Sequence, residues 1–197
     1  MHVAGPVATD LPPYVAFVDP VTVERLGKSW RPDCPVRADQ LRLVSLNRVG
    51  FDGQVHPGQL VVAATLATEV AHILADLYFD RFPIQRMETV EVYGADHERS
   101  LAANNSSAFN CRRTTGGTVW SSHAHGRAID INPVQNPHIA LDGSVRPRRG
   151  ARYVDRSRTG VGMIHPDGVA VRAFERRGWV WGGRRRDPSD YHHFERP

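Results

Sequence analysis

The chain has 197 residues, enough to bury one hydrophobic core but few for two domains. It contains no apolar run long enough to cross a bilayer, which excludes a transmembrane segment. A net charge of +4 favours an anionic partner such as a cell wall or a nucleic acid. No nucleic-acid motif accompanies the arginine cluster at residues 184–186, so we expect no nucleic-acid binding.

The N-terminal segment and the two cysteines bear on where the protein works. Residues 1–13 are expected to be a flexible leader, followed by one domain over residues 14–197, and no signal peptide is visible in the leader. Cys34 and Cys111 are far apart and belong to no C-x-x-C pair, which argues against a thiolate metal site. They are either reduced core residues or one disulfide formed in an oxidising compartment, and we favour the disulfide.

Local patterns predict a mixture of helices and short strands. Residues 59–64 have strand character, and the apolar spacing from Leu66 to Leu77 predicts an amphipathic helix that ends before Pro83. Further short strands are expected over residues 87–93, 108–112, 128–131 and 179–181, and a short helix over residues 97–104.

The C-terminal half continues this mixed order. Residues 136–158 are rich in Pro, Gly and Arg and are expected to form a long surface loop. Asp167 is a good N-cap for a helix up to Arg177, which Gly178 would end. The order of elements predicts an α+β fold, in which helices flank a small antiparallel sheet.

Two segments carry residues suited to chemistry. The first reads S-S-H-A-H-G-R-A-I-D from Ser121 to Asp130. Residues of opposite parity on a straight strand point to opposite faces, so His123 and Asp130 can share a ligand only if the chain bends, and Gly126 permits a bend. The second reads D-Y-H-H-F-E from residue 190, and one turn would place Asp190 and His193 side by side.

Imidazole nitrogens and carboxylate oxygens are the donors that a catalytic zinc ion uses. Three such ligands leave one position for water, and a free carboxylate nearby can accept its proton. The residue types do not select His193 over His192 or His125, and an ordinary hydrogen-bonded pair remains the alternative for His123 and Asp130. The histidines without a matching partner are expected to be structural or surface residues: His56, His72, His97, His138 and His165.

The run S-x-H-x-x-G-x-A-x-D at residues 121–130, followed by D-x-x-H at residues 190–193, resembles a family of zinc peptidases. This is the group of D-alanyl-D-alanine carboxypeptidases and VanY-like enzymes, with D,D-dipeptidases and L-alanyl-D-glutamate endopeptidases. The resemblance extends from about residue 60 to the end of the chain and includes N-N-S-S-A-F-N-C-R at residues 104–112. It implies that His123, Asp130 and His193 bind Zn²⁺, in a fold similar to the D,D-peptidases and the hedgehog N-terminal domain.

The resemblance also implies roles for neighbouring residues. Asp190 would be the general base, although some members carry Glu there, and Arg112 would assist the substrate carbonyl. The alternative for Arg112 is that it neutralises a buried acid. Ser121 would support a metal ligand rather than act as a nucleophile. Trp179 and Trp181 could line the substrate cleft, but their alternation across Val180 slightly favours the core.

The implied function is hydrolysis of a peptide bond in peptidoglycan stem peptides by a zinc-activated water, with Asp190 as general base. The enzyme would be a carboxypeptidase or an endopeptidase outside the cytoplasmic membrane, in the cell envelope or secreted. One alternative is a zinc-bearing cell-wall binding module that has lost catalysis, against which the acid at Asp190 argues. Another is a zinc peptidase acting on a non-wall D-amino-acid peptide, which the lack of a visible signal peptide keeps open, together with a cytoplasmic location.

Overall fold

The computed structural model describes residues 11–185 and 188–197. In these residues short helices and strands alternate, and the strands pair mostly antiparallel, which agrees with the expected α+β class. The expected leader lies outside the described residues except for residues 11–13. The carbonyls of Pro12 and Pro13 accept hydrogen bonds from Tyr78 and Asn47, so these two residues contact the domain. None of the described helices combines the length and apolarity needed to cross a bilayer.

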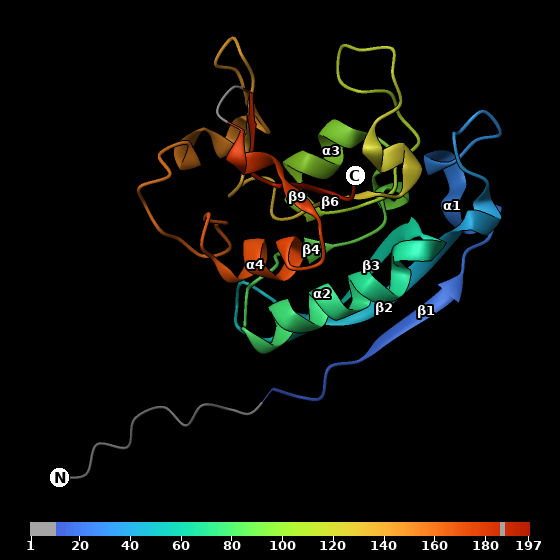
Figure 1. Cartoon of the computed structure of the whole chain (residues 1–197), viewed down its shortest axis with the longest axis horizontal. Helices are drawn as coiled ribbons and strands as arrows, with labels where there is room; N and C mark the ends of the chain where they lie inside the picture. The colour runs from blue at the N-terminus through green and yellow to red at the C-terminus, as the bar shows by residue number, and fades with distance from the viewer. Residues whose placement is uncertain (1–10, 186–187) are drawn as a thin grey trace.

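One antiparallel sheet and the longest described helix form the N-terminal part (Figure 1). The sheet has the order β1 (Ala16–Pro20), β2 (Leu41–Val49), β3 (Val55–Ala63). Helix α2 (Ala67–Phe79) packs against it through buried apolar residues at helical spacing. The strand expected over residues 59–64 and the helix expected from Leu66 are therefore confirmed, although β3 begins earlier, at Val55.

Two small antiparallel sheets follow, rather than the one small sheet that the sequence predicted. The first has the order β6 (Ala128–Asp130), β11 (His193–Glu195), β9 (Val180–Trp181). The second has the order β10 (Ser189–Asp190), β7 (His138–Ile139), β8 (Val145–Arg146). A short parallel pair joins β4 (Arg86–Met87) to β5 (Asn105–Ser106). The strands expected over residues 128–131 and 179–181 are confirmed as β6 and β9.

The other helical segments are short. The α-helices are α1 (Val23–Leu26), α3 (His97–Ala102) and α4 (Val169–Glu175). The 3₁₀ turns are Gly27–Ser29, Ala38–Gln40, Ala64–Leu66, Val90–Tyr93, Ser122–His125, Arg148–Tyr153 and Gly182–Arg184. Helix α3 confirms the helix expected over residues 97–104. Helix α4 confirms the later helix, but its N-cap is Gly168 and not Asp167.

Two expected strands and one expected loop are wrong. Residues 90–93 form a 3₁₀ turn because the Glu91 carboxylate accepts hydrogen bonds from the backbone of Lys28 and Ser29 and holds the segment against an earlier turn. Residues 108–112 form no ladder because their N–H groups donate to separate segments, Phe109 to Val61 and Cys111 to Ser29. The expected loop at residues 136–158 contains the β7–β8 hairpin and a 3₁₀ turn.

The main core joins the two parts of the chain. Phe194 of β11 stacks on Phe174 of α4 with ring centroids 4.0 Å apart. Trp179 and Trp181 are only 2% and 1% exposed, whereas Val180 between them is 40% exposed. The alternation therefore buries both indoles, as the core interpretation of this segment predicts.

Cys34 and Cys111 form a disulfide with a sequence separation of 77 residues, which confirms the pairing we favoured. The bridge ties the segment after α1 to the residue before Arg112. We expect the Cys34→Ser, Cys111→Ser double variant to lose about 2–4 kcal/mol of unfolding free energy, because the open chain gains entropy when unfolded. Urea unfolding of both proteins measures this difference. Reduced wild type should match the variant, and equal midpoints for oxidised wild type and variant would contradict the expectation.

Candidate metal centre and its pocket

His123 lies in a tight turn, and the glycine that follows this turn was the bend expected from the sequence. Ser121 caps the 3₁₀ turn Ser122–His125, and its Oγ accepts a hydrogen bond from the His123 backbone N–H at 3.3 Å. Gly126 follows with φ of +65°, and a Cβ there would lie 2.5 Å from the Ala63 nitrogen. Only glycine fits both the backbone angle and the space. The chain reverses at this point and enters β6, so the predicted bend at Gly126 is confirmed.

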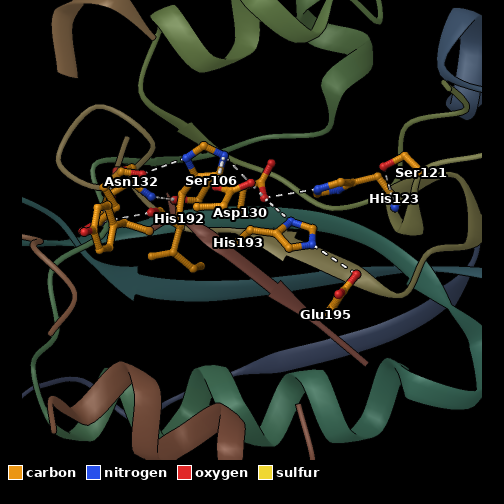
Figure 2. Close-up of polar contacts among 12 residues, drawn as sticks. Ser106, Ser121, His123, Asp130, Asn132, His192, His193 and Glu195 are labelled. Carbon is orange, nitrogen blue, oxygen red and sulfur yellow. Dashed lines mark hydrogen bonds and ion pairs between the residues drawn. The ribbon is translucent and has the colours of Figure 1, made fainter. Parts of the chain in front are cut away.

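Asp130 and His193 meet because they are paired across two strands. In the antiparallel register of β6 and β11, His193 lies directly opposite Asp130. Their neighbours Ile129 and Phe194 are fully buried in the core. Since side chains alternate along a strand, Asp130 and His193 must share the opposite face, where His123 also lies (Figure 2).

The three side chains converge on one point. His123 Nε2 lies 3.2 Å from Asp130 Oδ1, and His193 Nδ1 lies 3.0 Å from the same oxygen. One ligand atom from each residue lies within 4.8 Å of the other two, which makes the group a possible metal site. The structure thus brings together the three residues that the resemblance implied as ligands.

The hydrogen bonds around His123 show why a cation suits this cluster. His123 Nδ1 lies 2.6 Å from the carbonyl oxygen of Ala108, which can only accept a hydrogen bond. Nδ1 therefore carries a hydrogen, and when Nε2 carries none, its lone pair faces Asp130 Oδ1. Two buried acceptors facing each other require a proton or a cation between them. Two imidazole nitrogens and one carboxylate match the donors that zinc binds, so the residues fit such an ion.

The electrostatic environment keeps Asp130 of this cluster negatively charged, which favours a bound cation. Burial favours the neutral carboxyl form of Asp130, but the neighbouring histidines, with His123 foremost, outweigh burial and hold its pKa well below the usual range. Burial likewise disfavours the charged ring of His193, but hydrogen bonds to Asp130 and Glu195 raise its pKa to about 10. In the chain without metal, a proton on His193 thus takes the place of a cation beside the charged Asp130.

Glu195 contacts the ring nitrogen of His193 that does not face Asp130. The sequence reasoning missed this contact. Glu195 Oε2 lies 3.5 Å from His193 Nε2 and accepts a hydrogen bond from Ser122 Oγ at 2.7 Å. Its other carboxylate oxygen pairs with Arg185 at 3.2 Å. The hydrogen bond with His193 outweighs burial and lowers the pKa of Glu195 to about 2. Alternation along H-F-E was the available signal, because residues 193 and 195 share a face.

His192 lies between two carboxylates instead of joining the cluster. Its Nδ1 donates to the carbonyl of Asn136 at 2.7 Å. Its Nε2 lies 3.0 Å from Asp190 Oδ1 and 3.9 Å from Asp130 Oδ1. His125, the other candidate that the residue types left open, is half-buried and does not line the pocket.

The cluster opens into a pocket of about 500 Å³ that Asp190, Arg112 and Ser121 also line. Burial lowers the pKa of Arg112, while the charges of Asp130 and Asp190 act against this. Among the described residues, no carboxylate lies within ion-pair distance of Arg112. Its guanidinium lines the pocket without a direct ion pair, while the buried Asp130 acts on it at longer range, so the alternative that Arg112 neutralises a buried acid stays a prediction.

The structure also places four further side chains that the sequence analysis considered. Trp179 and Trp181 lie in the core and not in the pocket lining, so the cleft interpretation is wrong for both. Trp181 instead donates through Nε1 to the Tyr191 carbonyl at 2.9 Å and supports the turn before His193. His97 and His138 do line the pocket, although nothing in the sequence distinguished them. Burial, aided by the charge of Arg112, lowers the pKa of His97 to about 3, so this ring is neutral.

Comparison with known proteins agrees with this geometry. The family model described as D-alanyl-D-alanine carboxypeptidase matches residues 114–196, a range that contains the whole cluster and Asp190 but not Arg112. No curated protein and no solved structure matches the chain. Residues 114–196 are therefore similar to the D-alanyl-D-alanine carboxypeptidase family of peptidases, which supports the resemblance that the two motifs indicated.

Proposed function

We propose that this chain is a zinc-dependent peptidase that cleaves a peptide bond in peptidoglycan stem peptides. The observation that carries the proposal is the convergence of His123, Asp130 and His193 in a pocket that also holds the free carboxylate of Asp190. A structural ion would use four protein ligands, whereas three ligands leave room for water, as catalytic zinc sites do. When bound there, Zn²⁺ would lower the pKa of water toward about 7 and polarise the substrate carbonyl.

Asp190 is the proposed general base. It lines the same pocket, and its side chain is 30% exposed, so a reacting water can reach it. His192 Nε2 lies 3.0 Å from its Oδ1, and the other oxygen would accept a proton from the attacking water. The same carboxyl group then returns that proton to the leaving amine. No acyl-enzyme is needed, and Ser121, whose Oγ caps the turn that carries His123, stays a supporting residue.

Arg112 is the proposed partner of the developing oxyanion. Its guanidinium lies in the pocket and donates a hydrogen bond to the carbonyl of Arg113 at 3.2 Å. A preorganised cation in a partly buried site stabilises negative charge as it forms, without reorganising water. The preceding residue, Cys111, is tied by the disulfide, which holds this segment in place.

Glu195 is the proposed support of the metal ligand His193. We expect Glu195→Gln to weaken zinc affinity about 10- to 100-fold, because a carboxylate that orients a ligating histidine raises its basicity. Competition with a chromophoric chelator measures the affinity. Glu175→Gln is a matched control, since that carboxylate pairs with Arg184 on the surface. Unchanged affinity in Glu195→Gln would contradict this role.

The substrate class is tested with defined peptides. We expect the zinc-loaded chain to cut stem peptides at one bond, identified by mass spectrometry, in preference to peptides of L-amino acids. The disulfide supports a site of action outside the cytoplasm, where such substrates occur. If the chain cleaved only D-amino-acid peptides that do not come from the cell wall, the alternative of a peptidase with a non-wall substrate would be favoured. Zinc binding without any cleavage would favour the binding module.

A further inference from the structure

One face of the β7–β8 hairpin lines the pocket. Every second residue from 138 to 146 belongs to the lining: His138, Ala140, Asp142, Ser144 and Arg146. Leu141, between two of them, is 78% exposed and lies on the other side. This alternation is that of a β-hairpin laid along a cleft, so its inner face is positioned to contact whatever the pocket binds.

The hairpin is held in register with the proposed general base. Asp190 of β10 pairs with His138 of β7, and His138 pairs with Arg146 of β8, so the three form one row across the sheet. Neighbouring strands lie about 4.8 Å apart, which places the backbone of Arg146 roughly 10 Å from that of Asp190. An extended peptide covers this distance in about three residues.

The charged neighbours of Arg146 leave its guanidinium available. Its ion pair with Glu98 of α3 spans 3.7 Å, longer than the 2.7–2.9 Å of a well-formed charge-assisted bond. The two side chains are 43% and 60% exposed, so the pair is weak and exchangeable. Asp142 lines the pocket at the hairpin loop, where its carboxylate accepts a hydrogen bond from the Ser144 N–H at 2.9 Å.

Helix α3 also contributes to the lining of the pocket. His97 and Leu101 lie four residues apart on α3 and both line the pocket. They offer a neutral imidazole and an apolar surface, while Arg112 stands nearby. A peptide in the pocket would therefore meet polar and apolar side chains of α3 as well as Arg146 of the hairpin.

We propose that Arg146 binds a carboxylate of the substrate peptide, two or three residues from the bond that is cut. The pocket thereby selects an acidic peptide over its amidated counterpart. This inference rests on the proposed peptidase function. It adds that the site recognises a negative charge on the substrate. The bound carboxylate replaces Glu98 as the partner of Arg146.

The test uses peptide pairs that differ only by Glu or Gln, with the acidic position moved along the peptide. Zinc-loaded wild type should favour the acidic peptide about tenfold in kcat/KM at one position, mainly through KM. Arg146→Gln should lose this preference. Arg148→Gln, an exposed neighbour outside the pocket lining, should keep it. No preference in wild type, or an equal preference in Arg146→Gln, overturns the inference.

A binding measurement separates this inference from the peptidase function. Calorimetry on metal-free protein measures affinity for the same peptide pair when no cleavage can occur. An acid preference that Arg146→Gln removes supports the carboxylate site even if the zinc-loaded chain cleaves nothing, in which case only the peptidase proposal fails. If neither peptide binds, or both bind equally, the carboxylate site is wrong even where cleavage is found.

Discussion

Asp130→Asn is expected to fold and yet to lose both the bound zinc and peptide hydrolysis. Asp130 is the one carboxylate in the three-residue cluster, is 1% exposed and touches both histidines. An amide has the same shape but no charge, so it binds a cation far more weakly. Since a catalytic metal ion at this site would supply several kcal/mol of transition-state stabilisation, we expect kcat/KM to fall by at least about 10³-fold. Metal analysis, circular dichroism and a stem-peptide assay measure the three properties.

The matched control is His125→Ala, in the same turn as His123 but outside the pocket. This variant should keep both zinc and activity. If Asp130→Asn held zinc at the wild-type stoichiometry, Asp130 would not be a ligand and the proposed centre would be wrong.

Asp190→Asn should separate metal binding from turnover. Asp190 belongs to a different sheet from Asp130 and His193, and His192 Nε2 lies between the two carboxylates, 3.0 Å from Asp190 Oδ1 and 3.9 Å from Asp130 Oδ1. We therefore expect a normal zinc content. Without a carboxylate to accept the proton, kcat should fall about 10²- to 10⁴-fold, with a smaller change in KM.

Asp142→Asn is the control for Asp190, because it also removes a carboxylate from the pocket lining. Asp142 lies at the hairpin loop and should leave kcat nearly unchanged. Near-normal turnover by Asp190→Asn would refute its role as the base. Loss of zinc from this variant would instead make Asp190 a fourth ligand.

The parts of the site that sequence reasoning anticipated obey local rules. A glycine between His123 and Asp130 permits the bend that a straight strand would forbid, and Gly126 has the required positive φ. Alternation across Val180 indicates that both tryptophans are buried, and they are. Motif spacing combined with a family resemblance indicated the three cluster residues, although residue type alone left His192 and His193 equivalent.

The features of the site and the fold that sequence reasoning missed depend on contacts between segments that are far apart in the sequence. His138 enters the pocket because β7 pairs with β10, and nothing in residues 136–158 indicates that pairing. Residues 90–93 look like a strand from their β-branched content, but tertiary contacts of Glu91 favour a turn. The single sheet expected to carry the site is divided between two, because Asp190 pairs with the hairpin while His193, three residues later, pairs with β6.

The most direct test of the metal centre measures zinc content and stem-peptide cleavage together, on wild type and His123→Ala. We predict one zinc ion per wild-type chain and one defined cleavage product, with both lost in the variant. A wild-type chain that contains no zinc after careful preparation, and gains no activity when zinc is added, would contradict the proposed function.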